Sequence, residues 1–434
     1  MRPVTPEIQV LLNTLWVVTA AILVFFMQAG FALVESGMVR AKNAVNVIMK
    51  NYSDMCVGAI GFWAVGYGLM FGLNPSRWIG TTKFAPNTGE PFEFSLLFFQ
   101  MMFAATAATI VSGALAERIR FGAYLVGSFL ITTFIYPIYG SWAWNDNGWL
   151  KQLGFVDFAG STVVHTVGAC CALAGLAALG PRTGKFAKDG TPRTIPGHSL
   201  PFVALGGFVL WLGWFGFNAG STTAADLSIG KIALNTHLAG CAAATTSILL
   251  CHLLGRPVLL TTVVNASLAG LVAITAGCAS VTPGSALLIG IIAAPVMFIG
   301  EAFLDAFKID DAVGAIPVHG FCGVWGTFAV GVFKESGLDV RQMYIQLLGS
   351  AAAFFFVFPT AYIMYRMIGI WMKLRVSSID EQRGLDFAEH GEVGYPEFQE
   401  GLLHGGTAGT APAPVAPRPI STARPGVTAP AGRN

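Results

Sequence analysis

Hydrophobic residues occur along this chain in long uninterrupted runs, each bounded by short polar segments. A helix of about 20 apolar residues is long enough to cross the hydrocarbon core of a bilayer. Eleven such runs are predicted, near residues 11–34, 55–73, 94–116, 121–144, 158–180, 200–222, 232–255, 257–280, 283–304, 312–333 and 342–365. The pattern therefore predicts an all-α integral membrane protein with about eleven transmembrane helices.

The polar segments between the runs predict the orientation. An odd number of spans places the two termini on opposite sides of the membrane, and Lys and Arg concentrate in cytoplasmic loops. The segments after the odd-numbered spans hold eleven Lys and Arg residues, Lys50 among them, against seven on the other side. We therefore expect the N-terminus outside and the C-terminus in the cytoplasm. The first run is too long for a signal-peptide core and is expected to be a retained helix.

Composition supports this class of protein and excludes others. Of the 434 residues, 54% are hydrophobic and 11% are charged, whereas a soluble domain carries about 25% charged residues. The net charge of +2 argues against a nucleic-acid partner, which would need a basic surface. The seven cysteines contain no C-x-x-C pair, and we expect them to be small buried hydrophobic residues rather than disulfide or metal sites.

Two histidines lie inside apolar runs. VVHTVGACCALAGLAAL in span five and PVHGFCGVWGTFAV in span ten both begin near a V-H pair, five spans apart. That spacing is typical of an inverted repeat, whose shared site lies near the membrane midplane. His165 and His319 are expected to be uncharged there, able to share a proton and to bind a small polar solute. The alternative is that each only bonds a carbonyl on a neighbouring helix. No H-x-x-x-H pattern with a third ligand is present, so we expect no metal.

Aromatic and polar residues gather near the predicted outer ends of several spans. They are Phe99 and Phe103 in span three, Trp144 in span four, and Trp214, Phe217, Asn218 and Ser221 in span six. Aromatic faces attract cations, and a hydroxyl accepts hydrogen bonds from N–H donors, so the set suits a small cation. The alternative is an interfacial aromatic belt. Asp157 begins span five, either as a helix N-cap or as an anion that attracts a cation, and one carboxylate can do both.

Six motifs in order resemble the ammonium transporter (Amt) family, over residues from about 10 to 395. They are ESGMVRAKNAVNVIMKN, FQMMFAA…IVSGALAERIRF, DFAGSTVVHTVGACCALAG, GWFGFNAGS, IDDAVGAIPVHGFCGVWG and GLDFAEHGE. The resemblance implies two inverted five-helix repeats and a long final helix in residues 1–376, with one pore per subunit of a homotrimer. It also implies a cytoplasmic regulatory tail in residues 377–404. Residues 405–434 are rich in Ala, Pro, Gly and Thr and are expected to be disordered.

The resemblance also implies roles for individual residues. Phe103, Trp144 and Ser221 would form an outer ammonium site, with Asp157 as an essential acid nearby. Phe103 and Phe217 would form a stacked gate above the twin histidines, His165 and His319. The vestibule and pore would be lined by Phe99, Trp214 and Asn218. In the tail, Asp386, His390 and Gly391 would belong to the region that meets a trimeric regulator of the PII type. Trp144 is assigned in preference to Trp142, and Gly314 stands where many members carry a third aspartate.

The expected function is transport of ammonium or ammonia across the cytoplasmic membrane, without a cofactor. Moving an intact cation through an apolar pore costs several kcal/mol, so ammonium would lose its proton near the gate, ammonia would cross, and the proton would pass through the histidines. One rival is a passive gas channel like the Rhesus proteins, which lack the aromatic and serine site. Another is an ammonium sensor that signals through its tail. An enzyme is not expected, because no nucleophile–base pair is visible.

Overall fold

The computed structural model describes residues 5–396, and within these residues the chain is helical, without a β-strand. Ten helical segments are long and apolar enough to cross a membrane, and Leu260–Thr275 is a shorter eleventh. Each coincides with one of the predicted runs, so the predicted fold class is confirmed. The sequence succeeded here because spanning length and apolar composition are local properties.

The long helices are bounded as follows: α1 (Pro6–Met38), α2 (Ala44–Gly61), α4 (Pro91–Ala114), α5 (Phe121–Leu130), α6 (Tyr136–Trp144), α8 (Val167–Leu179), α9 (Leu200–Gly220), α10 (Ser228–Leu253), α11 (Leu260–Thr275), α12 (Pro283–Ala306), α13 (Cys322–Phe333) and α14 (Val340–Trp371). Short pieces are η1 (Ala41–Asn43), α3 (Tyr67–Phe71), α7 (Trp149–Leu153), α15 (Ser378–Arg383) and α16 (Leu385–His390). Four π-helical segments interrupt the crossings: η2 (Phe62–Gly66), η3 (Ile131–Ile135), η4 (Ser161–Thr166) and η5 (Ile316–Phe321).

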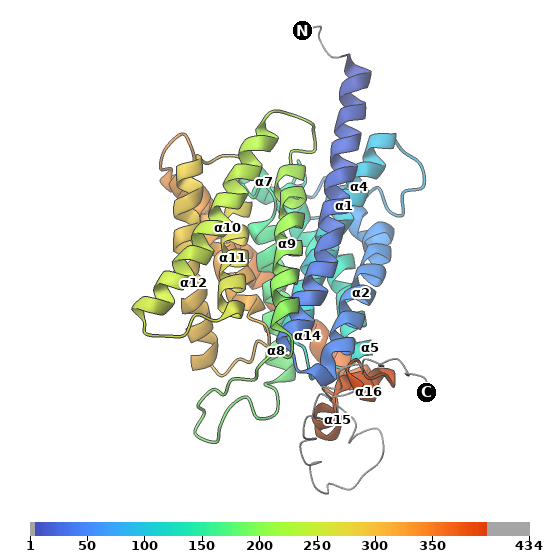
Figure 1. Ribbon diagram of the computed structural model, residues 1–434. Coiled ribbons are helices and arrows are strands. Elements are labelled where there is room, and N and C mark those ends of the chain that lie inside the picture. The colour runs from blue at the N-terminus through green and yellow to red at the C-terminus, as the bar shows by residue number, and fades with distance from the viewer. Residues whose placement is uncertain (1–4, 397–434) are drawn as a thin grey trace, which may run out of the picture.

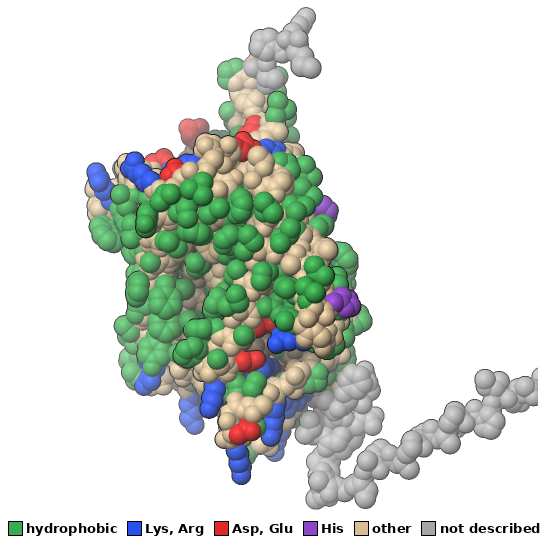
Figure 2. Space-filling view, turned by 90° about the vertical axis from the view of Figure 1, so that its left-hand side faces the viewer, with side chains coloured by type: hydrophobic (Ala, Val, Ile, Leu, Met, Phe, Trp, Pro, Cys, Tyr) green, Lys and Arg blue, Asp and Glu red, His purple; other side chains and the backbone are tan. Residues whose placement is uncertain are grey.

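The crossings stand side by side in one bundle (Figure 1). We call the end where α1 begins the upper face and the end where α15 and α16 pack the lower face. The start of α1 and the tail helices lie at opposite ends, as an odd number of crossings requires. Around the middle of the bundle the surface in Figure 2 is mostly hydrophobic, and Lys, Arg, Asp and Glu side chains gather toward its two ends. This distribution fits a bilayer as the surrounding solvent.

Helices α1 and α9 pack closely because glycines lie between them. A Cβ atom added to Gly206 of α9 would lie 2.6 Å from the backbone nitrogen of Val34 and 2.7 Å from the carbonyl oxygen of Gly30. Within a membrane, where lipid is as apolar as the side chains, small residues let helix backbones approach and gain van der Waals contact. The close approach holds α9, which carries Trp214 and Phe217, against α1.

Replacing Gly206 by alanine is expected to destabilise the protein by about 1–3 kcal/mol, the usual cost of overpacking. The methyl group would meet backbone atoms, which cannot rotate away. Thermal unfolding of the purified protein in detergent measures the effect. Gly122→Ala in α5 is the matched control, because nothing lies within 4 Å of its added Cβ. Equal unfolding temperatures for the two variants would contradict the expected result.

The second crossing begins earlier than the sequence predicts. The expected start was residue 55, because Lys50, Asn51 and Asp54 interrupt the apolar run, but α2 begins at Ala44. Lys50 and Asp54 are both fully buried, so the placement of Lys50 in a loop was wrong. Ten loop Lys and Arg residues then remain on the richer side against seven on the other, and the direction of the charge bias is unchanged.

The tail helices α15 and α16 pack at the lower face beside α2 and η1. Lys42 donates hydrogen bonds to the carbonyl oxygens of Glu381 and Gln382, and Asn43 accepts one from the backbone of Leu385. The tail is therefore attached to the segment that joins α1 to α2. The end of the predicted regulatory segment, and all of the predicted disordered segment 405–434, lie outside the described residues.

Candidate functional site

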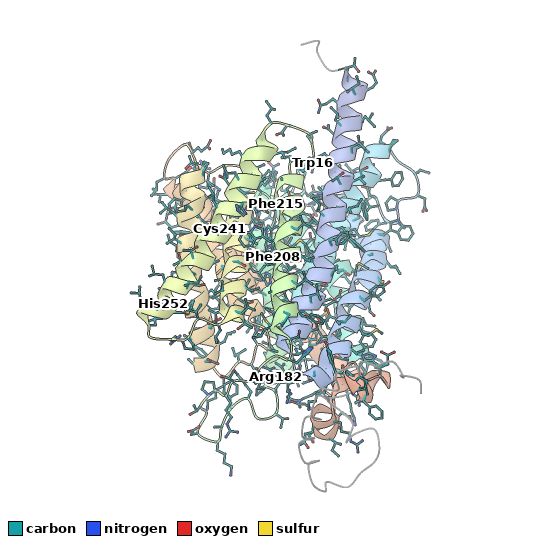
Figure 3. All side chains as sticks on the ribbon, viewed as in Figure 1. Trp16, Arg182, Phe208, Phe215, Cys241 and His252 are labelled. Carbon is teal, nitrogen blue, oxygen red and sulfur yellow. The ribbon has the colours of Figure 1, made fainter. Side chains whose placement is uncertain are left out.

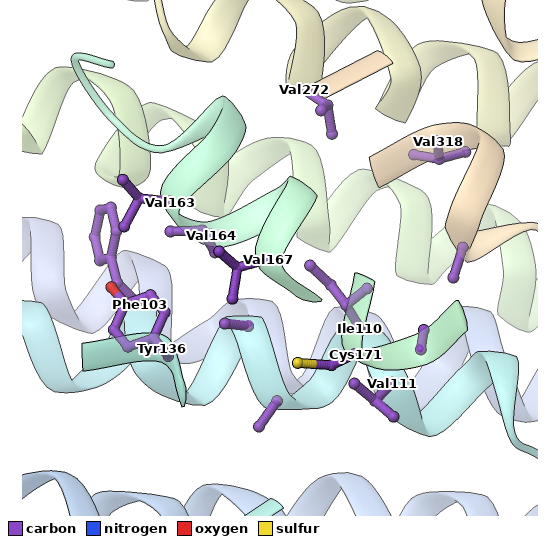
Figure 4. Close-up of a cluster of buried hydrophobic side chains, with 14 of the residues drawn as sticks. Phe103, Ile110, Val111, Tyr136, Val163, Val164, Val167, Cys171, Val272 and Val318 are labelled. Atoms are coloured by element: carbon purple, nitrogen blue, oxygen red, sulfur yellow. The ribbon is translucent and has the colours of Figure 1, made fainter. Parts of the chain in front are cut away.

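Two phenylalanine rings close the upper part of a line of aromatic side chains. Phe103 of α4 and Phe217 of α9 stack with centroids 4.0 Å apart and an interplanar angle of 18°. Phe99, one turn before Phe103, lies 4.6 Å from it. All three are fully buried. Figure 4 shows Phe103 beside Val163, and Ile110 further along α4 near Val167. The rings thus lie within an apolar wall built by α4, η4 and α8.

Trp144, and not Trp142, lies beside this stack. The Trp144 ring is 6.1 Å from Phe103, edge to face, and its indole N–H donates to the carbonyl oxygen of Asp157 at 2.7 Å. Trp142 turns to the other side of α6, where it packs against Trp78 and Phe356. The two tryptophans are only two positions apart in the sequence, so the side of the helix that each faces distinguishes them.

Ser221 and Asn218 lie at the upper end of α9. The Ser221 hydroxyl donates to the carbonyl oxygen of Phe217 at 2.8 Å, which commits its hydrogen and leaves its oxygen as an acceptor for N–H groups. The Asn218 amide donates to Thr236 at 3.0 Å, while its Oδ1 is buried without a protein partner. Both residues therefore keep an acceptor oxygen at the upper end of α9.

His165 and His319 meet directly below the stack. Their Nδ1 atoms are 3.2 Å apart, and the rings are nearly parallel with centroids 5.1 Å apart. His165 also stacks against Trp214 at 5.2 Å and against Phe217 at 5.4 Å. The indole N–H of Trp214 donates to Thr275. One proton between two nitrogen atoms at this distance gives a hydrogen bond, so the neutral pair can pass a proton.

Each histidine belongs to a π-helical turn, a feature that is often found at functional sites. Asp157 precedes His165 by eight residues and accepts hydrogen bonds from the backbone of Gly160, Thr162 and Val163. Asp157 is therefore a helix cap, one of the two roles that the sequence left open. Asp311 precedes His319 by the same interval and accepts from Val313, Gly314 and Ile316.

Each of these two caps contains a glycine in a left-handed conformation. Gly160 and Gly314 have φ angles of 113° and 79°, a region that side chains other than glycine adopt at a cost. Gly314 is thus the structural counterpart of Gly160. The sequence analysis missed Asp311 as a site residue, although the pattern D-x-x-G-x-x-x-V-H occurs at both Asp157 and Asp311.

Two cavities lie below the histidine pair. The smaller has a volume of about 20 Å³, about enough for one water molecule, and is lined by residues that include Phe31, Glu35 and His319. The larger has a volume of about 490 Å³ and is lined by residues that include Glu301, Asp305 and Asp311. Asn265, Val313 and Gly314 line both. The larger cavity therefore leads from the lower side toward the pore.

A buried network of ion pairs holds the lower face together. Arg182 binds Asp310 through two hydrogen bonds of 2.8 Å and Glu117 through one of 2.9 Å. Arg40 binds Glu117 from the other side, and Arg118 donates to the carbonyl oxygen of Asp310. Figure 3 labels Arg182 at this end of the molecule. The network joins the loops before α5, after α8 and before η5.

The charges of this network shift the pKa values of its acids. Burial alone would raise the pKa of Glu117, but the hydrogen bond from Arg40 and the charge of Arg182 lower it to about 2. Burial would likewise raise the pKa of Asp310, but the hydrogen bonds of Arg182 and the charge of Arg118 lower it to about 2. Both carboxylates are therefore ionised at neutral pH.

The three tail residues lie where α16 contacts α2. Asp386 is buried and accepts a hydrogen bond from the backbone of Asn46. The side-chain amide of Asn46 lies 3.0 Å from Nε2 of His390; because an amide nitrogen only donates, this ring nitrogen accepts and the imidazole is neutral. Burial also lowers the pKa of His390. Gly391 ends α16 with a left-handed φ of 67°.

Among the described residues, no group of three or more His, Cys, Asp or Glu side chains is placed to hold a metal ion. Five of the seven cysteines are buried, Cys241 is half-buried and Cys56 is exposed, so the expectation that all would be buried was wrong for these two. Cys56 faces outward from α2, where lipid would cover it.

Comparison with known proteins identifies relatives of the whole helical bundle. The model of the Ammonium Transporter Family matches residues 15–395. The ammonium transporter Amt2 of Archaeoglobus fulgidus is 45% identical over 424 residues, which cover 91% of this chain and 90% of that protein. A solved structure described as a Sensor Amt Protein has a TM-score of 0.87 and 40% identity, covering 89% of this chain and all of that chain. Mep2 of Candida albicans has a TM-score of 0.79 and 30% identity, covering 89% and 92%.

Proposed function

The chain belongs to the ammonium transporter family, and from this premise we propose that it recruits ammonium at the upper aromatic site, removes its proton and passes ammonia through the histidine pore. One observation carries the proposal. The Phe103–Phe217 stack, the His165–His319 pair and the cavity of about 20 Å³ follow one another from the upper to the lower side.

Recruitment rests on the groups above the stack. Trp144 and Phe103 offer ring faces to a cation, and cation–π contact contributes about 0.5–2 kcal/mol. Ser221 offers an acceptor oxygen, because its hydrogen is committed to Phe217. Asp157 is bound to three backbone N–H groups, but a capped carboxylate still projects negative potential. Phe99, Trp214 and Asn218 would line the path.

Deprotonation supplies selectivity. A cation at the centre of a membrane costs about 2.5–3.5 kcal/mol or more, and ammonium avoids that cost by leaving its proton on the imidazole pair. The rings of the stack move apart to let ammonium reach the imidazoles below, and the neutral ammonia then continues through the pore. The potassium ion has the same charge as ammonium but no proton to give up. Net transport is therefore expected to carry one charge for each ammonia.

The proposal is tested by the transient current of the purified protein in proteoliposomes on a solid-supported membrane. An ammonium pulse is expected to give a current that an equal potassium pulse does not. Ammonium binding without current, together with fast uptake of neutral ammonia, would instead indicate a gas channel. Equal currents with the two cations would reject deprotonation as the origin of selectivity.

Trp144→Leu is expected to raise the ammonium concentration for half-maximal current by about 2- to 30-fold, the equivalent of one cation–π contact of 0.5–2 kcal/mol. Trp142→Leu is the matched control, because its ring lies on the other side of α6. The measurement is a concentration series of ammonium pulses. A larger effect at Trp142 than at Trp144 would contradict the proposed recruitment site.

The second candidate function is an ammonium sensor that signals through its tail. It is favoured by the 40% identity to the structure described as a Sensor Amt Protein and by the attachment of α16 to α2. Binding of ammonium without current or uptake, accompanied by a change in the protease sensitivity of the tail, would favour this function over transport.

We further propose a homotrimer in the cytoplasmic membrane, with the upper face outside. His237 and Thr245 are exposed on α10 at membrane depth, where polar groups are costly in lipid and a second copy would cover them. The tail at the lower face would then meet a regulator of the PII type in the cytoplasm. Native mass spectrometry in detergent, with and without added PII protein, tests both the assembly and the partner.

A further inference from the structure

A cluster of charged side chains lies inside the membrane-spanning bundle, beside the proposed pore. Glu35 of α1 and Lys50 and Asp54 of α2 are at most 2% exposed. Ionisable residues at membrane depth are costly and usually functional. The proposed transport mechanism gives these three no role, and none of them was among the predicted site residues.

The three side chains are bound by neutral partners on neighbouring helices. Glu35 accepts a hydrogen bond of 3.1 Å from Asn51. Lys50 donates to the carbonyl oxygen of Ser112 at 3.2 Å and lies 5.4 Å from the ring centre of Tyr124. The carboxylate of Asp54 accepts hydrogen bonds from Thr109 and Tyr124. Helices α1, α2, α4 and α5 therefore build one connected polar cluster.

The charges of the cluster do not balance. It contains two carboxyl groups and one amine, and the next charged neighbours of Lys50, Arg118 and Glu117, have opposite signs. An uncompensated buried carboxylate costs several kcal/mol. The arrangement with the lowest cost therefore keeps one extra proton within the cluster, on Asp54, and leaves Glu35 as a carboxylate next to the charge of Lys50.

The cluster also has unused hydrogen-bonding capacity. The Oδ1 of Asn51 and the Nε2 of Gln28 are buried without a protein partner. Buried polar groups in proteins are nearly always hydrogen-bonded, to water where no side chain reaches them. These atoms therefore indicate water molecules between the charged groups, which a mobile proton can follow.

Glu35 connects the cluster to the pore. It lines the cavity of about 20 Å³ that His319 also lines. Gly113 makes room for it, because a Cβ at that position would lie 2.9 Å from the carboxyl carbon of Glu35. One water molecule in this cavity would have polar partners in His319, Glu35 and Asn265, which suffices to hold it. The larger cavity begins at Asn265.

We propose that Glu35 is the proton acceptor below the histidine pair, taking the proton that ammonium leaves there and releasing it to water in the lower cavity. This inference rests on the proposed function. An N–H bond of ammonium breaks and an N–H bond forms on an imidazole. The imidazolium at His319 then gives a proton through one water molecule to the Glu35 carboxylate, which becomes a neutral acid and later loses the proton. Lys50 and Asp54 keep Glu35 ready to accept it.

The test measures current and ammonia uptake on the same proteoliposomes. Glu35→Gln keeps the size of the side chain and the bond to Asn51 but cannot accept a proton. The ammonium current is expected to fall about 100-fold or more, the usual contribution of a positioned acid–base group. In the Glu35→Gln variant, a gradient of neutral ammonia should still make the vesicle lumen alkaline. The Glu35→Asp variant should regain much of the ammonium current. Glu335→Gln, at an exposed site bound to Lys231, is the control.

Each outcome decides between the alternatives. An unchanged current in Glu35→Gln overturns this inference but leaves the proposed function standing. The same holds if Glu35→Gln loses current and ammonia uptake together and Glu35→Asp restores neither. Absence of current in the intact protein overturns the proposed function and the inference with it. If Glu35→Gln does not fold, infrared difference spectra of Glu35→Asp and of the intact protein provide the test. Ammonium is expected to induce a carboxylic-acid band, and this band should lie at a different frequency in Glu35→Asp. A band at the same frequency in both proteins overturns the inference.

Discussion

Replacing His165 and His319 together by alanine is expected to lower the ammonium current about 100-fold or more. Without the imidazoles ammonium must cross as a cation, at a cost of about 2.5–3.5 kcal/mol or more, and each 1.36 kcal/mol is a factor of ten in rate. Residual conduction should also lose selectivity, since potassium and ammonium then meet the same barrier. The ratio of ammonium to potassium current should therefore approach one.

The solid-supported membrane assay measures both quantities, and a second histidine variant supplies the control. His252→Ala removes an exposed imidazole at the lower end of α10 and should leave current and selectivity unchanged. A double variant that kept both the current and the preference for ammonium would show that the proton takes another route, and the histidine pair would then be only a packing element.

Replacing Arg182 by methionine is expected to destabilise the protein by about 3–5 kcal/mol, the usual cost of breaking a buried ion pair. The variant keeps much of the side-chain volume but removes the guanidinium group that binds Asp310 and one oxygen of Glu117. Thermal unfolding in detergent measures the loss. Arg193→Met, in the same lower loop but exposed, is the control and should change little. Equal stability of the two variants would show that the network contributes nothing.

The same network predicts a dependence of stability on acid. The pKa values of Glu117 and Asp310 are lowered in the folded protein to about 2, so protonation favours the unfolded chain. Their contribution is fully present above the ordinary pKa values of 4.5 and 3.8 and is lost as the pH falls toward 2. Unfolding temperatures of the intact protein should drop through this range, and those of Arg182→Met should drop less.

The sequence by itself determined the membrane architecture. Each membrane-spanning helix corresponds to a continuous run of apolar residues that is long enough to span the bilayer. The predicted runs 121–144 and 283–304 differ little from the helices in the structure. The V-H pairs predict an inverted repeat, because inverted halves keep the same local spacing, and the repeat stays a prediction. The resemblance to the Amt family named the residues of the site, but their roles in this chain remain predictions.

Tertiary structure alone decided which residues meet. His165 and His319 are 154 positions apart, and no local pattern records that their rings stack. The direction of α6 decides that Trp144, and not Trp142, faces Phe103. Lys50 was predicted to lie in a loop, because an unpaired charge is more stable in water than in a membrane. In the structure, Ser112 and Tyr124 from other helices contact Lys50 within the bundle. A charge is tolerated inside a membrane only when distant segments supply its partners, and the arrangement of helices brings those segments together.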